Sequence, residues 1–490
     1  MKLLPYLKNI SAIALFTAVT GGAQASLNDA EKGQIIQRMN LRADSIARTA
    51  DSIWNYAELG FHETKSSALL QEQMKQAGFT VDAGVAGMPT AFIARYRNGK
   101  GGPVIAILAE FDALPGLAQE AVPERKPIAG QAAGHACGHH LFGAASAAAA
   151  IEAARWMKEK GIAGEIRLYG APAEEGGSGK AYLVREGLFK DVDATLHWHA
   201  GDNNSAVQRI SQANISGKFR FHGKSAHAAG DPQNGRSALD GVEILNHAAN
   251  MLREHVPDTT RIHYVITNGG GAPNVVPDYA EVYYYVRHND ARIVRDVMNR
   301  VQDAAKGAAM ATGTTVEFEQ TGGVYALLPN NQLGLLMDAN LRLVGGVNWT
   351  AEEKAFAEKL YTTFPNPARK LGSETSILPY ASDVTGEGSS DVGDVSWVTP
   401  TAGIRAATWG PGTSAHSWQA VAFGGMSIGH KGAVVAAKTI ALSALDLMTS
   451  PDVVAAARKE LQQRRPADFE YRSLIGDRPP ALNYRESGSN

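Results

Sequence analysis

The sequence has one cysteine, little net charge and no basic surplus. Because Cys137 is the single cysteine among 490 residues, no internal disulfide can form. The 47 lysines and arginines nearly match the 49 aspartates and glutamates, so the net charge is only -2. Such a chain has no positive excess to bind a phosphate backbone, and we expect no nucleic-acid partner. With 44% hydrophobic and 20% charged residues, it is typical of a globular protein, and its length predicts at least two domains.

The sequence also lacks a long apolar run that would predict a membrane span after its first 25 residues. Those first residues carry Lys2 and Lys8, a short apolar stretch at 10–19, and the sequence Ala23-Gln24-Ala25. This pattern is typical of a secretory signal peptide with its cleavage site before Ser26. A membrane anchor is the alternative, but the apolar stretch is too short to cross a bilayer. We predict a signal peptide at 1–25 and a soluble periplasmic or secreted mature protein.

Helix and strand patterns alternate over residues 26–212. Alternation of this kind predicts an α/β domain with a mainly parallel sheet, in which the loops after the strand ends carry ligands. Helical spacing occurs at 44–56, 66–77 and 141–158, and compact apolar strands at 103–109, 165–169 and 194–198.

Residues 213–324 follow a different rhythm. The expected order is strand 219–222, helix 237–255, strands 261–267 and 280–287, helix 291–311 and strand 315–319. This β-α-β-β-α-β order predicts a ferredoxin-like α+β module inserted as a lid domain. The chain is then expected to return to the catalytic domain over 325–490. There we expect long loops at 372–425 and a packed helix at 433–447, while the tail after Pro466 gives little signal.

Cysteine and histidine gather in the segment GHACGHH at 134–140. Thiolate and imidazole are natural ligands of zinc-like ions, and the glycines let Cys137 and His139 face one ion. The alternative is a loop whose histidines are incidental.

A pair of carboxylates, Glu174 and Glu175, follows a predicted strand in the segment APAEEGG at 171–177. Adjacent carboxylates can take different roles, because one can bind a metal while the other activates water as a general base. A solvated acidic turn is the alternative interpretation.

Two further histidine sites complete the candidate set. His197 and His199 lie on the same face of a predicted strand, and His416 is at the centre of the loop 410–418. Each alone could be a structural histidine with a satisfied hydrogen bond. Together with the two preceding segments, they supply enough nitrogen, sulfur and oxygen ligands for two ions that share a bridge.

The order of these motifs resembles a metallopeptidase family that contains aminoacylases, carboxypeptidase G-type enzymes, auxin-conjugate hydrolases and hippurate hydrolase. The resemblance runs from about residue 35 to 445 and rests on GHACGHH, APAEEGG, GKSAHAAGDPQNGRSALD, APNVVPD, SSDVGDVSWVTPT and GTSAHSWQAVAFGGMSIGHKG. It implies an amidohydrolase with two divalent ions (zinc, manganese or cobalt). The expected substrate is an N-acyl amino acid, in particular an N-aroyl one such as an aroyl-glutamate.

The resemblance also implies two ligand sets that share Cys137, which stands where most relatives carry a bridging aspartate. The sets are Cys137, Glu175 and His416 for one ion, and Cys137, His139 and His199 for the other. His199 is preferred to His197 because its spacing from Asp193 matches the family pattern. Glu174 would be the general base.

In the lid, the resemblance gives His227 and Asn274 the task of polarising the scissile carbonyl, often across a dimer interface. Arg287 would hold the substrate carboxylate in a bidentate contact. Without the resemblance, His227 would be interpreted as a turn cap and Arg287 as part of a surface salt bridge. Glu110 and Asp112 replace the usual His-x-Asp and are expected to orient ligands. A homodimer is expected, or assembly with a second subunit.

Three other functions remain as alternatives. A cysteine amidase with Cys137 as nucleophile and His139 as base would need no metal, and it leaves the Glu174-Glu175 pair unexplained. A periplasmic small-molecule binding protein would need neither a set of metal ligands nor a pair of carboxylates after a strand. A metallo-dipeptidase or carboxypeptidase of the same fold would share the site but take a different substrate.

Overall fold

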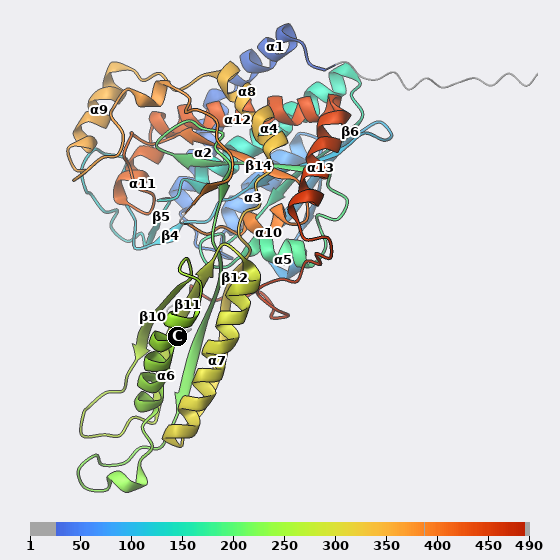
Figure 1. The fold of residues 1–490 in the computed structure, drawn as a ribbon. Helices are drawn as coiled ribbons and strands as arrows, with labels where there is room; N and C mark the ends of the chain where they lie inside the picture. Colours follow the sequence, from blue (N-terminus) through green and yellow to red (C-terminus); the bar gives the residue numbers. More distant parts are fainter. Residues whose placement is uncertain (1–25, 387, 486–490) are drawn as a thin grey trace, which may run out of the picture.

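The computed structural model describes residues 26–386 and 388–485, and the predicted signal peptide lies outside this part of the chain. The described residues form a larger α/β body and a smaller lid that projects from it (Figure 1). The lid contains the antiparallel sheet, and the body contains the mainly parallel one.

The body is built on a six-stranded sheet. Its strands, in spatial order, are β1 (Thr80–Ala83), β2 (Phe92–Asn98), β6 (Gly164–Gly170), β3 (Val104–Ala109), β7 (Ala194–Gly201) and β14 (Thr401–Ala407). The last four run parallel, whereas β1 and β2 are antiparallel to their neighbours. Every residue of β3 and β6 is buried, as is typical of central parallel strands covered on both faces. The predicted α/β fold with a mainly parallel sheet is confirmed.

Helices surround this sheet. They are α1 (Asp29–Asn40), α2 (Ala43–Tyr56), α3 (Thr64–Gln76), α4 (His139–Lys160), α5 (Gly179–Arg185), α8 (Asn331–Val344), α9 (Ala351–Tyr361), α10 (Val392–Ser396), α11 (Trp418–Gly424), α12 (Ser427–Thr449) and α13 (Pro451–Arg464). Helices α4 and α12 pack against each other and against the sheet. By length and hydropathy α12 could cross a membrane, but 94% of its apolar window is buried inside the body. A helix that is buried to this extent by its own protein is a core helix.

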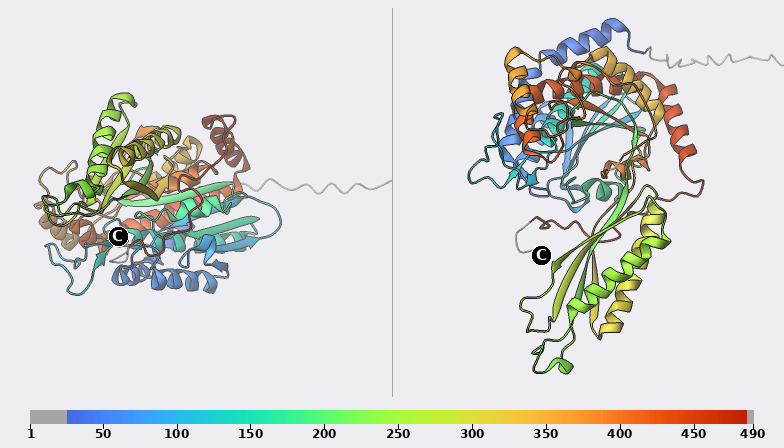
Figure 2. Two further views of the ribbon diagram at one scale, coloured as in Figure 1. Left: turned by 90° about the horizontal axis from the view of Figure 1, so that it is seen from below. Right: turned by 60° about the vertical axis from the view of Figure 1, so that its left-hand side comes forward.

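The lid follows the expected β-α-β-β-α-β order. Its elements are β9 (Ala213–His222), α6 (Ala238–Leu252), β10 (Arg261–Asn268), β11 (Tyr279–His288), α7 (Ala291–Thr312) and β12 (Thr315–Val324). The antiparallel sheet has the order β10-β11-β9-β12. Both helices cover one face of this sheet and leave the other without helices (Figure 2). Along β11 the alternation is clear, because Val282 and Tyr284 are buried under the helices while Tyr283 and Tyr285 are half-buried on the open face.

Two expectations about the last third of the chain were wrong or incomplete. Residues 372–425, predicted as long loops, contain α10, α11, the short β13 (Val384–Thr385) and the edge strand β14. The sequence of β14 is mostly small residues, so pairing with β7, rather than local propensity, makes it a strand. The tail after Pro466 is packed between the two domains: Leu474 is buried in the lid core and Ile475 in the core of the body.

Candidate metal centre

The candidate residues gather where the parallel strands end. Glu110 and Asp112 follow β3, Glu174 and Glu175 follow β6, and His199 is near the end of β7. The loop 410–418 follows β14, and His139 begins α4. Ligand sites in α/β sheets form at this edge, because the loops after parallel strands meet there.

Within the described residues, three groups of histidine, cysteine and carboxylate side chains have ligand atoms within 4.8 Å of one another. They are Cys137, His139 and His199; Cys137, Glu175 and His416; and His139, Glu174 and Glu175. The Sγ of Cys137 lies 3.5 Å from His199 Nε2, and His416 Nε2 lies 3.0 Å from Glu175 Oε1. The structure therefore brings together all six side chains that the sequence placed at the metal site or beside it.

His199 has its ring oriented as a ligand, whereas His197 does not join these groups. The Nδ1 of His199 lies 2.8 Å from the carbonyl oxygen of Ala200, so Nδ1 carries the proton and donates it. Its Nε2 is then left with a lone pair that faces Cys137, as a metal-binding imidazole requires. His197 lines the same cavity but is not part of any of the three groups.

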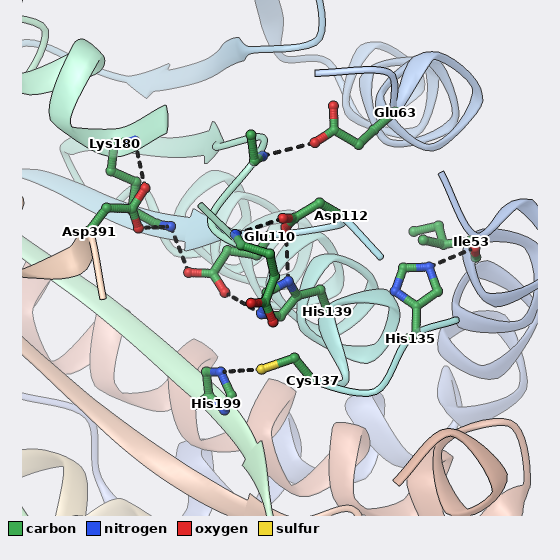
Figure 3. A network of polar contacts seen from close by, with 12 residues as sticks. Ile53, Glu63, Glu110, Asp112, His135, Cys137, His139, Lys180, His199 and Asp391 are labelled. Carbon is green, nitrogen blue, oxygen red and sulfur yellow. Dashed lines mark hydrogen bonds and ion pairs between the residues drawn. The ribbon is translucent and has the colours of Figure 1, made fainter. Parts of the chain in front are cut away.

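A buried set of charges fixes His139 (Figure 3). Its Nδ1 lies 2.8 Å from Asp112 Oδ1, and its Nε2 lies 3.1 Å from Glu110 Oε2. The fully buried Lys180 pairs with Glu110 and with Asp391, at 2.7 Å each. Burial disfavours a charged imidazole, but the acidic groups that face the ring, Cys137 first and then Asp112 and Glu110, outweigh burial and raise the pKa of His139. The expectation that Glu110 and Asp112 orient a ligand agrees with these contacts.

The loop that carries the two glutamates is held in a strained conformation. Ala173 and Ser178, which flank it, have φ angles of 55° and 59°, and His416 has a φ of 59°. Non-glycine residues adopt this left-handed region at a cost, and such strain is concentrated at functional sites.

Contacts from three other segments compensate for that strain. Glu63 accepts a hydrogen bond from the Ala173 N–H at 2.8 Å, and Asp112 accepts one from the Glu175 N–H at 2.9 Å. The hydroxyl of Tyr484 in the C-terminal tail donates to the Glu175 carbonyl at 3.0 Å. Sequence reasoning missed Glu63 and Tyr484, because nothing near them in the chain resembles a catalytic motif.

The protonation preferences agree with the chemistry that these side chains are expected to perform. Burial raises the pKa of the Cys137 thiol, so a thiolate here needs a cation beside it. Burial, followed by repulsion from Glu110 and Glu175, raises the pKa of Glu174 well above its usual range. A carboxylate with a raised pKa can both accept and return a proton.

The donor set fits a pair of divalent ions. Sulfur, imidazole nitrogen and carboxylate oxygen suit zinc, manganese and cobalt. Three ligand-type atoms at the centre, Glu110 Oε2, His139 Nε2 and Glu175 Oε1, are buried and make close polar contacts, but within the described residues none of these contacts has hydrogen-bond geometry. Buried polar atoms normally form well-oriented hydrogen bonds, so these atoms remain suited to contact a ligand.

The lid residues are not brought to this centre within one chain. His227 and Asn274 meet at the far tip of the lid, where the Ala228 N–H donates to the Asn274 carbonyl at 3.0 Å. The ten residues of β9 separate this tip from the body, a length of roughly 30 Å in an extended strand. Arg287, on β11, stacks over the Tyr285 ring at 5.3 Å and does not line the cavity at the metal centre.

A cavity of about 500 Å³ opens beside the metal ligands. Cys137, Glu174, Glu175, His199 and His416 form one part of its wall. Another part has a different chemistry, since Arg209, Arg369 and Arg405 line it together with Asp202.

Comparisons with known proteins define the class. A family model described as a peptidase dimerisation domain matches residues 211–312, which is most of the lid. A crystal structure of a dinuclear metal-binding peptidase from the M20 family of Bacillus subtilis shares the fold, with a TM-score of 0.54 and 16% identity, over 84% of this chain and 98% of that one. A relative from Escherichia coli (strain K12) is 40% identical over 440 residues, which cover 84% of this chain and 91% of the relative. The chain therefore belongs to the M20 family of metallopeptidases and amidohydrolases, and it is a hydrolase of that family.

The Escherichia coli relative is one of the subunits of p-aminobenzoyl-glutamate hydrolase. The family resemblance that the sequence motifs indicate is confirmed. Xaa-Arg dipeptidase of Mus musculus is also similar, with 28% identity over 464 residues that cover 91% of this chain and 95% of the relative. The names of these two relatives specify leaving amino acids of opposite charge, so similarity alone does not choose the substrate.

Proposed function

We propose that this protein is a metal-dependent amidohydrolase that cleaves N-aroyl amino acids such as p-aminobenzoyl-glutamate. The observation that carries the proposal is the pair of ligand groups that share Cys137, with Glu174 beside them. The name of the 40% identical relative supports the substrate class. A dipeptidase that releases arginine is the second candidate, favoured by the similarity to Xaa-Arg dipeptidase.

Two divalent ions (zinc, manganese or cobalt) would be held by the two ligand groups, with Cys137 as their common ligand. When bound, such a pair supplies a water molecule of lowered pKa and a Lewis acid for the amide oxygen. Asp112 and Ala200 would keep His139 and His199 in the required tautomers, because each of these residues fixes one Nδ1.

Glu174 would take a proton from the attacking water and return it to the leaving amine. Burial and the neighbouring charges of Glu110 and Glu175 raise its pKa, which favours the protonated carboxyl that this proton transfer requires. His227 would polarise the amide carbonyl. Its Nδ1 accepts hydrogen bonds from the Ala229 and Gly230 N–H groups, so its Nε2 carries the proton and can donate it to an oxygen. The same two bonds make His227 a turn cap, and the two roles are compatible.

The distance of the lid tip from the metal centre is consistent with a homodimer in which each lid serves the site of its partner. The match of the lid to a peptidase dimerisation domain supports this assembly. Asn274 would act beside His227, and Arg287 would hold the α-carboxylate of the substrate. Since the relative is named as one subunit of its enzyme, a second assembly, with a different subunit, is also supported.

The signal-like sequence of residues 1–25 supports export, so we propose a periplasmic or secreted mature form. Determination of the N-terminal residue of the protein made in a Gram-negative host tests this proposal. A mature protein that begins at Ser26 agrees with export, whereas an intact N-terminus in the cytoplasmic fraction contradicts it.

The decisive experiment measures release of p-aminobenzoate from p-aminobenzoyl-glutamate by wild type, Glu174→Gln and Cys137→Ser, with the metal content of each. We expect chelation to abolish activity, and Glu174→Gln to keep its metal while losing about 10²- to 10⁴-fold in kcat. Cys137→Ser is expected to lose metal as well as activity. Activity that survives chelation but disappears in Cys137→Ser would instead identify the thiol as a nucleophile.

A further inference from the structure

The arginine-lined wall of the cavity contains positive charge that the protein itself does not neutralise. Arg405 is the one exposed residue of β14, whose other residues are all buried. Its side chain has no ion pair or side-chain hydrogen bond with any residue in the described ranges, and the same holds for Arg209. A guanidinium that faces a cavity without a paired carboxylate can form a bidentate contact with an anionic ligand.

Strand register places Arg405 beside the metal centre. In the parallel pair of β7 and β14, Arg405 is directly opposite His199, so both side chains leave the same face of the sheet. The two residues also line the same cavity. Desolvation by the surrounding cavity wall, followed by repulsion from Arg209, lowers the pKa of Arg405, although its side chain keeps access to solvent, and Arg369 acts in the same direction. Arg209 and Arg369 are therefore both close enough to Arg405 to repel it.

The carboxylates near the cluster are already occupied. Asp202 Oδ2 lies 3.4 Å from Arg369 Nε and accepts a hydrogen bond from the Gly412 N–H, while its Oδ1 accepts one from Asn203. Glu110 is paired with Lys180. One negative charge thus faces three positive ones on this side of the cavity. In addition, the Oγ of Ser389 is buried in the same wall without a partner among the described residues.

We propose that Arg405, with Arg209 and Arg369, forms an anion subsite for the side-chain carboxylate of the amino acid that the reaction releases. The inference rests on the proposed function and makes it more specific, since it selects N-acyl derivatives of acidic amino acids. A planar guanidinium binds a carboxylate through two parallel N–H···O bonds, and the Ser389 hydroxyl can donate a third. A leaving arginine side chain would be repelled by the same groups, so the subsite separates this protein from a dipeptidase that releases arginine.

Matched substrates test the subsite. The probes are the p-aminobenzoyl derivatives of glutamate, glutamine and arginine, which share the acyl group and the scissile bond. Wild type is expected to prefer glutamate to glutamine by about 10- to 100-fold in kcat/KM, the value of a charge-assisted contact. Arg405→Gln should remove that preference by lowering kcat/KM for the glutamate derivative alone. Arg405→Glu should reverse the order of the glutamate and arginine derivatives.

Controls separate the subsite from general effects. Arg48→Gln removes one positive charge from an exposed position on α2 and is expected to change nothing. Arg405→Lys keeps the charge and should restore part of the preference, which a purely structural role would not produce. If Arg405→Gln lowers kcat/KM equally for the glutamate and glutamine derivatives, the subsite is overturned, because Arg405 would then support the metal ligands beside it.

Equilibrium binding distinguishes failure of the subsite from failure of the proposed function. Glutarate and its diamide are titrated into the metal-loaded, full-length protein by calorimetry. Binding of glutarate that Arg405→Gln weakens, without hydrolysis of any aroyl substrate, would keep the subsite and reject the function. Hydrolysis of the glutamate and glutamine derivatives at equal rates, with no glutarate binding, would keep the function and reject the subsite.

Discussion

The body and the lid both carry residues expected to act on the substrate, but they hold them in opposite ways. In the body, His139 is fixed by two carboxylates, one of which pairs with a fully buried lysine. In the lid, His227 lies in an exposed loop at the tip, and its ring accepts hydrogen bonds from two backbone N–H groups of its own turn. The body thus provides rigid ligand geometry, whereas the proposed donor of the lid would have to travel to the substrate or be supplied by another chain.

This contrast follows from the energetics of each task. Metal ligands must be deprotonated and oriented before an ion binds, so buried charge networks that limit their motion are useful there. A group that polarises the carbonyl only in the closed state can remain exposed between turnovers. Three predictions test the contrast, beginning with the one of largest effect.

Loss of the lid donor should be rescued by a second chain. His227→Ala is expected to lower kcat about 10²- to 10³-fold, the cost of one donor to the developing oxyanion. Mixing it with the inactive Glu174→Gln under conditions that exchange subunits should restore up to about one quarter of wild-type activity, because one site in each mixed dimer is complete. Steady-state turnover of the mixture measures this effect. Mixed dimers without activity would place His227 in its own chain's site.

Removal of the buried lysine should destabilise the body strongly. Lys180→Met removes the buried cation that Glu110 and Asp391 share, which costs about 3–5 kcal/mol in the free energy of unfolding. The matched lid variant Lys306→Met removes an exposed pair with Asp303 and should cost less than about 1 kcal/mol. Urea unfolding of both variants provides the comparison. Similar losses in the two would contradict the view that the buried pairs of Lys180 stabilise the body more than an exposed pair stabilises the lid.

A smaller effect concerns Glu63, which supports the strained loop. Burial, followed by repulsion from Asp112, raises its pKa from an ordinary 4.5 to about 8. Between these values the folded protein keeps a proton that the unfolded chain has lost. Stability therefore falls as pH rises through this window, by up to about 1.4 kcal/mol per pH unit.

Glu63→Gln should remove this pH dependence. The unfolding free energy of the variant, relative to that of wild type, should therefore increase from pH 5 to pH 8. Urea titrations at several pH values measure the difference, with the exposed Glu72→Gln on α3 as the control. A difference that does not change with pH would show that Glu63 is ionised throughout the window.

The sequence predicts some levels of this structure well and others not at all. Helices and strands with strong periodicity, such as those of the lid, follow from local pattern, and the motifs that carry Cys137, Glu174 and His416 indicate the side chains that the fold brings together. The β14 strand has no such pattern, because its residues are small and its conformation depends on pairing with β7.

The arginine cluster is missed for the same physical reason. Arg405 becomes a neighbour of His199 only through the register of two strands far apart in the chain, and no spacing rule contains that information. The C-terminal tail is similar, since its polar sequence does not indicate that Tyr484 reaches the loop of Glu175.

The connections of the lid also bear on how this architecture can change. Because β9 and β12 are adjacent, Asn214 and Val324 are paired neighbours, about 5 Å apart in their Cα atoms. The chain thus leaves and re-enters the body at a single point, and a short turn could join the two ends if the module were deleted. Exchange of the lid between homologues would not change the path of the chain through the catalytic domain. The tail would have to be redesigned in such a chimaera where it packs against the module that would be replaced: Leu474 is buried in the lid core, and Phe469 and Tyr471 pack against that core.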